Sequence, residues 1–158
     1  MRTVLTLAAL TLQLTQAVAQ EWTPFGIKKF GFIVDVPPGF VYVRSVRENG
    51  EEGAAFRNAD GDAIVVWGIS LNIRDFRDHV EALIGQHEGE GWDITYKRLT
   101  PKWAAYSGIK DGLVRYVKAI AVCEDRVAFF LIDYGRGFKR DYDPVVTQME
   151  KSLKREGC

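Results

Sequence analysis

The sequence predicts an α+β domain in which an antiparallel β-sheet is flanked by helices. Three features support this fold class. Segments with alternating apolar residues recur along the chain, two other segments have helical spacing, and short turn sequences separate neighbouring strands. Because short turns join antiparallel strands and parallel strands need long crossovers, this pattern favours hairpins. The order strands, helix, strands, helix then predicts one antiparallel sheet with helices packed on it.

Turn residues divide the predicted strands. GFIVDVPPGF predicts a strand that stops at Pro37-Pro38, and FVYVRSV predicts either a second short strand or an extended edge. GAAFRNA and AIVVWGISL alternate, and Asp60-Gly61 between them is typical of a hairpin turn. Four further strands, DITYKRL, WAAYSGI, GLVRYVKAIAV and RVAFFLIDY, are separated by Pro101, by Lys110–Gly112 and by Glu124-Asp125. They predict a meander of antiparallel hairpins.

Two segments have the spacing of amphipathic helices. The first is expected to end at Gly89 and Gly91. Its apolar face comprises Phe76, Val80, Leu83, Ile84 and His87. The second is expected to begin with Asp143 as N-cap and Pro144 in its first turn. Its apolar stripe comprises Val145, Val146, Met149 and Leu153.

Residues 1–19 have the layout of a secretory signal peptide. Arg2 supplies positive charge, Val4–Leu14 is apolar except for Thr and Gln, and Ala17-Val18-Ala19 offers small residues to a signal peptidase. The apolar run is too short to span a bilayer, and no second segment of the sequence is long enough for membrane insertion. We therefore expect export to the periplasm or secretion, with cleavage after Ala19. The alternative is a buried N-terminal helix.

Length and charge limit the kinds of partner. Removing 19 residues from 158 leaves residues 20–158, a length of 139 that fits a single domain with its own core. The full chain has 21 Lys plus Arg and 21 Asp plus Glu, and loss of Arg2 leaves 20 against 21. A nearly neutral domain lacks the long-range field that attracts nucleic acid or an anionic membrane, so we expect neither partner.

Cys123 and Cys158 are the two cysteines of the sequence. A pair in an exported protein is more often bridged than free, so we expect a disulfide that ties residue 158 to the core. Two free thiols, or pairing of Cys158 between molecules, are the alternatives. A redox-active pair is disfavoured because no Cys-x-x-Cys spacing occurs.

The segment FRNADGDAIVVW raises the choice between a cation site and a turn. An alignment to a calcium loop that places Gly61 at the invariant glycine puts Phe56 and Trp67 at ligand positions. Neither side chain binds calcium, and strands rather than helices flank the segment. NADGD is therefore predicted to be a turn, with a weak surface cation at Asp60 and Asp62 as the alternative.

No coherent set of catalytic residues occurs in the sequence. The only histidines, His79 and His87, are eight residues apart on one predicted helix, about 12 Å along its axis, which is too far to share a zinc ion. Ser107-Gly108-Ile109-Lys110 matches a Ser-x-x-Lys motif, but it runs from a strand into a turn and lacks the companion motifs. We therefore expect no metal, no cofactor and no enzymatic activity.

Two groups of residues are candidates for binding. Arg136, Lys139 and Arg140 come just before the predicted last helix, where backbone amides and two glycines favour an anion. The alternative for these cations is a solvated basic loop. Trp103 and Tyr106, if they face solvent, would anchor a protein partner. Otherwise both aromatics belong to the core.

The order of five segments resembles a known family. They are KKFGFIVDVPPGF, GAAFRNADGDAIVVWG, GWDITYKR, KDGLVRYVKAIAVCEDRVAFFLIDY and DYDPVVTQMEKSLK. Together they resemble small exported bacterial proteins of the PsbP-like type. That fold is shared by the extrinsic subunit of plant photosystem II and by a nuclear-import factor that binds the GTPase Ran. The resemblance covers most of residues 20–158. It implies a PsbP-like α/β/α sandwich and non-enzymatic work, such as docking on a larger protein, but it assigns no site residues.

The sequence thus predicts an exported, non-catalytic accessory protein that docks on another exported protein or assembly. One alternative is a secreted inhibitor or immunity-type protein that blocks one enzyme. Another is an anion or small-molecule binder that uses the loop with Arg136, Lys139 and Arg140. The sequence leaves the oligomeric state open.

Overall fold

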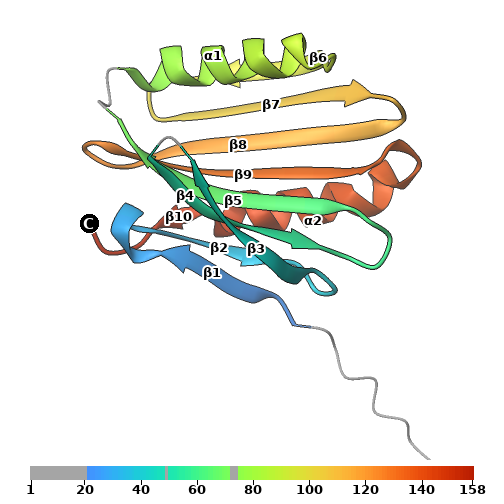
Figure 1. The fold of residues 1–158 in the computed structure, drawn as a ribbon, viewed down its shortest axis with the longest axis horizontal. Helices are drawn as coiled ribbons and strands as arrows, with labels where there is room; N and C mark the ends of the chain where they lie inside the picture. Colours follow the sequence, from blue (N-terminus) through green and yellow to red (C-terminus); the bar gives the residue numbers. More distant parts are fainter. Residues whose placement is uncertain (1–20, 49, 72–74) are drawn as a thin grey trace, which may run out of the picture.

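The computed structural model describes residues 21–48, 50–71 and 75–158, which form ten strands and two α-helices (Figure 1). The strands are β1 (Thr23–Ile27), β2 (Phe32–Val36), β3 (Val41–Glu48), β4 (Glu51–Arg57), β5 (Ala63–Ser70), β6 (Asp93–Leu99), β7 (Trp103–Lys110), β8 (Leu113–Cys123), β9 (Arg126–Gly135) and β10 (Lys154–Arg155). The α-helices are α1 (Phe76–Gly89) and α2 (Lys139–Ser152). The 3-10 turns η1 (Lys28–Phe30) and η3 (Arg136–Phe138) precede β2 and α2.

The strands of the described residues form two sheets. The large sheet has seven strands in the order β3-β4-β5-β9-β8-β7-β6, and the small sheet has three in the order β1-β2-β10. All strand pairs given by these orders are antiparallel, as the hairpin turns predict. The predicted α+β class is therefore confirmed. The single sheet is corrected to two, and the predicted signal peptide lies outside the described residues.

The large sheet buries apolar side chains on both of its faces. Along β9, Phe129 and Leu131 belong to the cluster beneath α1, whereas Phe130 and Ile132 belong to the cluster beneath α2 and the small sheet. A strand that is covered on both faces reads as a continuous apolar run rather than an alternation. The molecule is therefore layered: α1, then the large sheet, then the small sheet with α2 (Figure 1).

Phe30 joins the small sheet to the large one. Its side chain is fully buried and lies against Gly68 of β5, where a Cβ would come within 2.5 Å of the ring. Every second side chain of β2 faces the same interface, because Phe32, Val34 and Val36 are buried in the core between the two sheets. A glycine at position 68 thus allows the two sheets to approach each other closely.

Helix α1 matches the helix that the sequence predicts. Phe76, Val80, Ile84 and His87 are buried, as expected for its apolar face, and Leu83 packs at the margin of the same cluster. The helix extends through Gly89 and is followed by Gly91, whose φ of 93° is typical of the end of a helix. Its buried face lies on the sheet and brings His87 close to β7.

Helix α2 begins earlier than the sequence predicts. It starts at Lys139 rather than at Asp143, so Pro144 lies inside the helix instead of in its first turn. The prediction was wrong because it used local signals alone. In the structure the additional turn is held by a tertiary contact, since the Tyr142 ring stacks on Tyr134 of β9 with centroids 4.3 Å apart.

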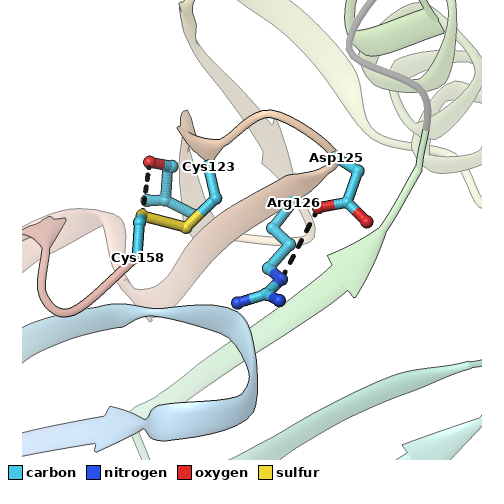
Figure 2. The surroundings of a disulfide bond; sticks show 5 residues. Cys123, Asp125, Arg126 and Cys158 are labelled. Atoms are coloured by element: carbon cyan, nitrogen blue, oxygen red, sulfur yellow. Dashed lines mark hydrogen bonds and ion pairs between the residues drawn. A yellow bond between two sulfur atoms is a disulfide. The ribbon is translucent and has the colours of Figure 1, made fainter.

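The C-terminal segment crosses from α2 to the end of β8. Strand β10 pairs with β2, the amide of Glu156 donates to the carbonyl oxygen of Gly31 at 2.8 Å, and Cys158 is bonded to Cys123 (Figure 2). Gly31 has a φ of 69°, and a Cβ there would lie 3.0 Å from the Cys123 sulfur. The expected disulfide is therefore present, and such a bond is typical of proteins in an oxidising compartment.

Candidate functional site

The NADGD segment forms the turn that the sequence predicts between β4 and β5. The Asn58 Oδ1 accepts hydrogen bonds from the amides of Asp60 and Asp62, at 3.1 and 2.9 Å. The Asp62 carboxylate accepts from the Tyr142 hydroxyl, from the Asn58 amide and from the Gly135 amide. These bonds tie the turn to α2 and β9, so protein donors use the carboxylate that a cation would need.

The described residues contain few features of a metal site or a membrane anchor. Across residues 21–48, 50–71 and 75–158, no group of three or more His, Cys, Asp or Glu side chains is placed to hold a metal ion. No helix in these ranges is long and apolar enough to cross a bilayer. Every buried side-chain nitrogen or oxygen in the described part has a hydrogen-bond partner.

Tyr106 does not face solvent, so the condition under which it would anchor a partner is not met, and it belongs to the core. Its side chain is 1% exposed and lies beneath α1, with the hydroxyl 3.0 Å from Nδ1 of His87. Burial raises the pKa of the Tyr106 hydroxyl and lowers the pKa of His87. His79 is half-buried against Phe129, and burial also lowers its pKa. Both histidines are therefore part of the packing of α1.

The low pKa of His87 predicts a loss of stability in acid. Above the ordinary value of 6.5 the imidazole is neutral in both the folded and the unfolded states. As the pH falls below 6.5, the unfolded state binds the proton first, so the free energy of unfolding falls by up to about 1.4 kcal/mol per pH unit until the folded pKa is reached. Arg115 lowers the pKa further, while Glu90 and Asp133 oppose it. Urea denaturation at pH 7.5 and pH 5 measures this fall.

The control for this prediction separates His87 from the other titrating groups. In His87→Gln the fall between the two pH values should be smaller than in the parent protein. The fall should also be smaller in His79→Gln, because burial lowers the pKa of His79 as it lowers that of His87. Equal falls in the parent and in His87→Gln would contradict the assignment.

A surface beside α2 carries the candidate site, and we call it the β6–β8 surface. It comprises Tyr96 and Arg98 of β6, Trp103 and Ser107 of β7, and Tyr116 and Lys118 of β8. Cross-strand pairing places these side chains on one face, because Tyr96 pairs with Ser107 and Ser107 pairs with Tyr116. Tyr96 is 47% exposed, and Trp103 is partly exposed. The face is the one that α2 covers farther along the sheet.

Two cations flank Trp103. The Lys118 Nζ lies 4.1 Å from the centre of the indole ring, and the Arg98 guanidinium carbon lies 5.1 Å from it. Glu150 of α2 accepts a hydrogen bond from Lys118 at 3.0 Å and another from the Tyr116 hydroxyl at 2.6 Å. Burial and this bond to Glu150 raise the pKa of Tyr116. The helix thus fixes the floor of the surface, while Arg98 and Tyr96 form its exposed side.

A hollow of about 280 Å³ continues this surface along the N-terminal half of α2. Its lining residues are Ser107, Val114, Tyr116, Tyr134, Lys139, Asp143, Val146 and Thr147. The Lys139 ammonium donates to both carboxylate oxygens of Asp143, at 2.7 and 3.0 Å. The cation and the carboxylate that line the hollow are therefore paired with each other. The hollow and the β6–β8 surface together offer aromatic and polar side chains for contact with a partner.

The three cations of the predicted anion site are not in a loop before the last helix. Arg136 lies in η3, and Lys139 and Arg140 form the first turn of α2. Arg136 borders a separate hollow with Asp93 and Lys110, whereas Lys139 lines the hollow beside α2. The structure thus distributes the cations over two hollows. Anion binding by these residues stays a prediction.

Sequence reasoning found Trp103 but missed the residues around it. Tyr96 and Arg98 are two positions apart on one strand, so their shared face was predictable from the period of a strand. Their proximity to Trp103 depends on the register of β6 on β7, which contains a bulge between Ile94 and Tyr96. The bond from Lys118 to Glu150 depends on where α2 crosses the sheet.

Comparison with known proteins gives a structural match and no sequence match. No family model matches the chain, and no curated protein matches it either. The solution structure of cyanobacterial PsbP (CyanoP) from Synechocystis sp. PCC 6803 is similar, with a TM-score of 0.63 and 9% sequence identity. The match covers 90% of this chain and 97% of the cyanobacterial chain. This likeness shows that the chain has a PsbP-like fold.

Proposed function

We propose that this protein is an exported, non-catalytic accessory protein that docks on another exported protein through its β6–β8 surface. The observation that carries the proposal is the group formed by the exposed Tyr96 and Arg98 and the partly exposed Trp103 on two neighbouring strands. Tyrosine, arginine and tryptophan are the residue types that dominate binding energy at protein interfaces. A rigid sheet holds all three, so little conformational entropy is lost when a partner orders them.

Two further observations support a docking role. The similar solved structure is a PsbP, and the resemblance seen in the sequence implies docking and assembly work rather than catalysis. Beside the surface, Lys118 is paired with Glu150 and Lys139 is paired with Asp143. A general acid or base would instead need a group that is free to exchange a proton with a substrate.

Affinity capture with a matched pair of variants tests the proposal. Tagged residues 20–158 would be incubated with the exported fraction of the source organism, and bound proteins identified by mass spectrometry. Arg98→Glu reverses a charge on the β6–β8 surface, whereas Lys97→Glu makes the same change at the next position, which pairs with Tyr106 and lies on the opposite face. We expect one salt-resistant partner with the parent protein and with Lys97→Glu. Arg98→Glu should retain at least about tenfold less of it.

Two outcomes would overturn or refine the proposal. Equal capture by Arg98→Glu and the parent protein would overturn the β6–β8 surface as the docking site. An inhibitor or immunity-type role is separated by the activity of the captured partner, which an inhibitor would abolish and an accessory protein would preserve. Near-ultraviolet circular dichroism of both variants establishes that they are folded.

A further inference from the structure

The start of strand β3 exposes three consecutive large apolar side chains. Val41 is 65% exposed, Tyr42 is 57% exposed and Val43 is 49% exposed. They form half of the strongly exposed large hydrophobic residues in the described part of the chain, the others being Tyr96, Leu113 and Phe138. Single exposed apolar residues are common on protein surfaces, whereas exposed apolar residues grouped at one place are a feature of sites that bind another molecule.

Strand β3 is also an edge of the large sheet. It pairs with β4 and is the first strand in the sheet order, whereas α1 packs near the other edge, at β6 and β7 (Figure 1). An edge strand presents unpaired amide and carbonyl groups, to which an extended chain can add as a further strand. The β6 edge differs, since its exposed Tyr96 stands singly between the polar residues Thr95 and Lys97. Apolar exposure and an open edge thus coincide at β3.

The charge next to this apolar run is positive. Val41 pairs with Arg57 and Arg44 pairs with Ala55, so the two arginines lie on the same face of β3 and β4. Both are exposed, and within the described residues neither forms an ion pair. Farther along β3, Arg47 pairs with Glu52 across the strands.

We propose that β3 accepts an extended, acidic segment of a partner protein as an additional antiparallel or parallel strand. Backbone hydrogen bonds along the edge supply affinity, and carboxylates beside Arg44 and Arg57 supply selectivity. A second copy of this chain fits less well. Antiparallel pairing of two copies about the step between Ser45 and Val46 would place Arg44 of each copy opposite Arg47 of the other, and like charges across strands are destabilising.

This site is separate from the β6–β8 surface, which lies at the other end of the strand order. A negative result for binding at β3 can therefore be told apart from a negative result for docking through the β6–β8 surface. Arg98→Glu should leave binding at β3 unchanged, and Arg44→Glu should leave capture through the β6–β8 surface unchanged.

Binding of a synthetic peptide tests the proposal directly. The first peptide alternates valine with glutamate, and the second alternates valine with lysine. Fluorescence anisotropy of each labelled peptide is measured against residues 20–158. We expect the glutamate peptide to bind, and Arg44→Glu to weaken its binding by at least about tenfold. Lys97→Glu on the β6 edge is the matched control and should have no effect. Amide shifts in the nuclear magnetic resonance spectrum should be largest along β3.

Several results would overturn the proposal. These are equal binding of the two peptides, equal binding by Arg44→Glu and the parent protein, or no binding of the glutamate peptide at millimolar concentration. A parent dimer in sedimentation that becomes monomeric in Val43→Lys would assign the edge to a second copy instead. The thermal unfolding of each variant is compared with that of the parent protein, so that a folding defect is not read as lost binding.

Discussion

Replacing Cys158 with serine is expected to lower the free energy of unfolding by about 3–4 kcal/mol. The disulfide to Cys123 closes a loop with a sequence separation of 35 residues, and its loss enlarges the unfolded ensemble. Urea denaturation of the oxidised parent protein and of Cys158→Ser measures the difference. Adding a reductant to the parent should reproduce the stability of the variant.

The effect of this change should be local as well as global. Without the bond, the segment that contains β10 is held to β2 by short backbone pairing and by the hydrogen bond from Glu156 to Gly31. Hydrogen exchange should therefore rise first at the amide of Ile33, which is paired with Lys154 of β10. Cys123→Ser should match Cys158→Ser, and the double variant should add little because both changes remove one bond. A Cys158→Ser protein as stable as the oxidised parent would contradict this prediction.

Replacing Gly68 with alanine is expected to destabilise the protein by about 3 kcal/mol. The new Cβ would lie 2.5–2.7 Å from three atoms of Phe30, including its Cβ, which belongs to the rigid part of that residue. Phe30 is fully buried between the two sheets, so it has no free space to move into. The small sheet must then separate from β5, and the midpoint of urea denaturation should fall.

Gly85→Ala is the matched control for Gly68→Ala. Gly85 lies inside α1, and a Cβ there meets nothing within 4 Å. Alanine stabilises a helix interior relative to glycine, so this variant should gain about 0.5–1 kcal/mol. The same chemical change is therefore expected to have opposite signs at the two positions. A loss of less than about 1 kcal/mol in Gly68→Ala would show that the sheets repack around the added methyl group.

Local patterns predicted the elements whose signals are contained in a short segment. The turn between β7 and β8 is one example, since Asp111 and Gly112 have φ angles of 49° and 79°, as an Asp-Gly hairpin turn requires. Helix α1 is another, because its apolar stripe lies within the helix and Gly89 and Gly91 mark its end. The disulfide followed from the presence of two cysteines and an expected export signal.

Elements that depend on distant partners were missed or misplaced. The alternating pattern of β2 predicts a strand but does not say which sheet the strand joins. Its pairing with β1 on one side and β10 on the other depends on contacts with distant parts of the chain. Strand β1 contains Pro24 and Gly26, both of which oppose a prediction of strand, and pairing with β2 overrides this local preference. Strand β7 is apolar on both faces, so the sequence did not distinguish the buried Tyr106 from the partly exposed Trp103.

The candidate site was predictable only in part for the same reason. Trp103 was identified from its residue type, whereas the roles of Arg98 and Lys118 at its ring depend on strand register. The basic residues near Lys139 were recognised as a group. Their arrangement differs from the predicted loop because α2 begins at Lys139, which places the Lys139 ammonium within hydrogen-bonding distance of Asp143.

The affinity of the captured partner tests the central claim most directly. The partner would be purified, and its dissociation constant measured for the parent protein, for Arg98→Glu and for Lys97→Glu at the same salt concentration. Docking through the β6–β8 surface predicts an affinity at least about tenfold weaker for Arg98→Glu and an unchanged affinity for Lys97→Glu. Equal affinities for all three proteins, or a loss confined to Lys97→Glu, would contradict it.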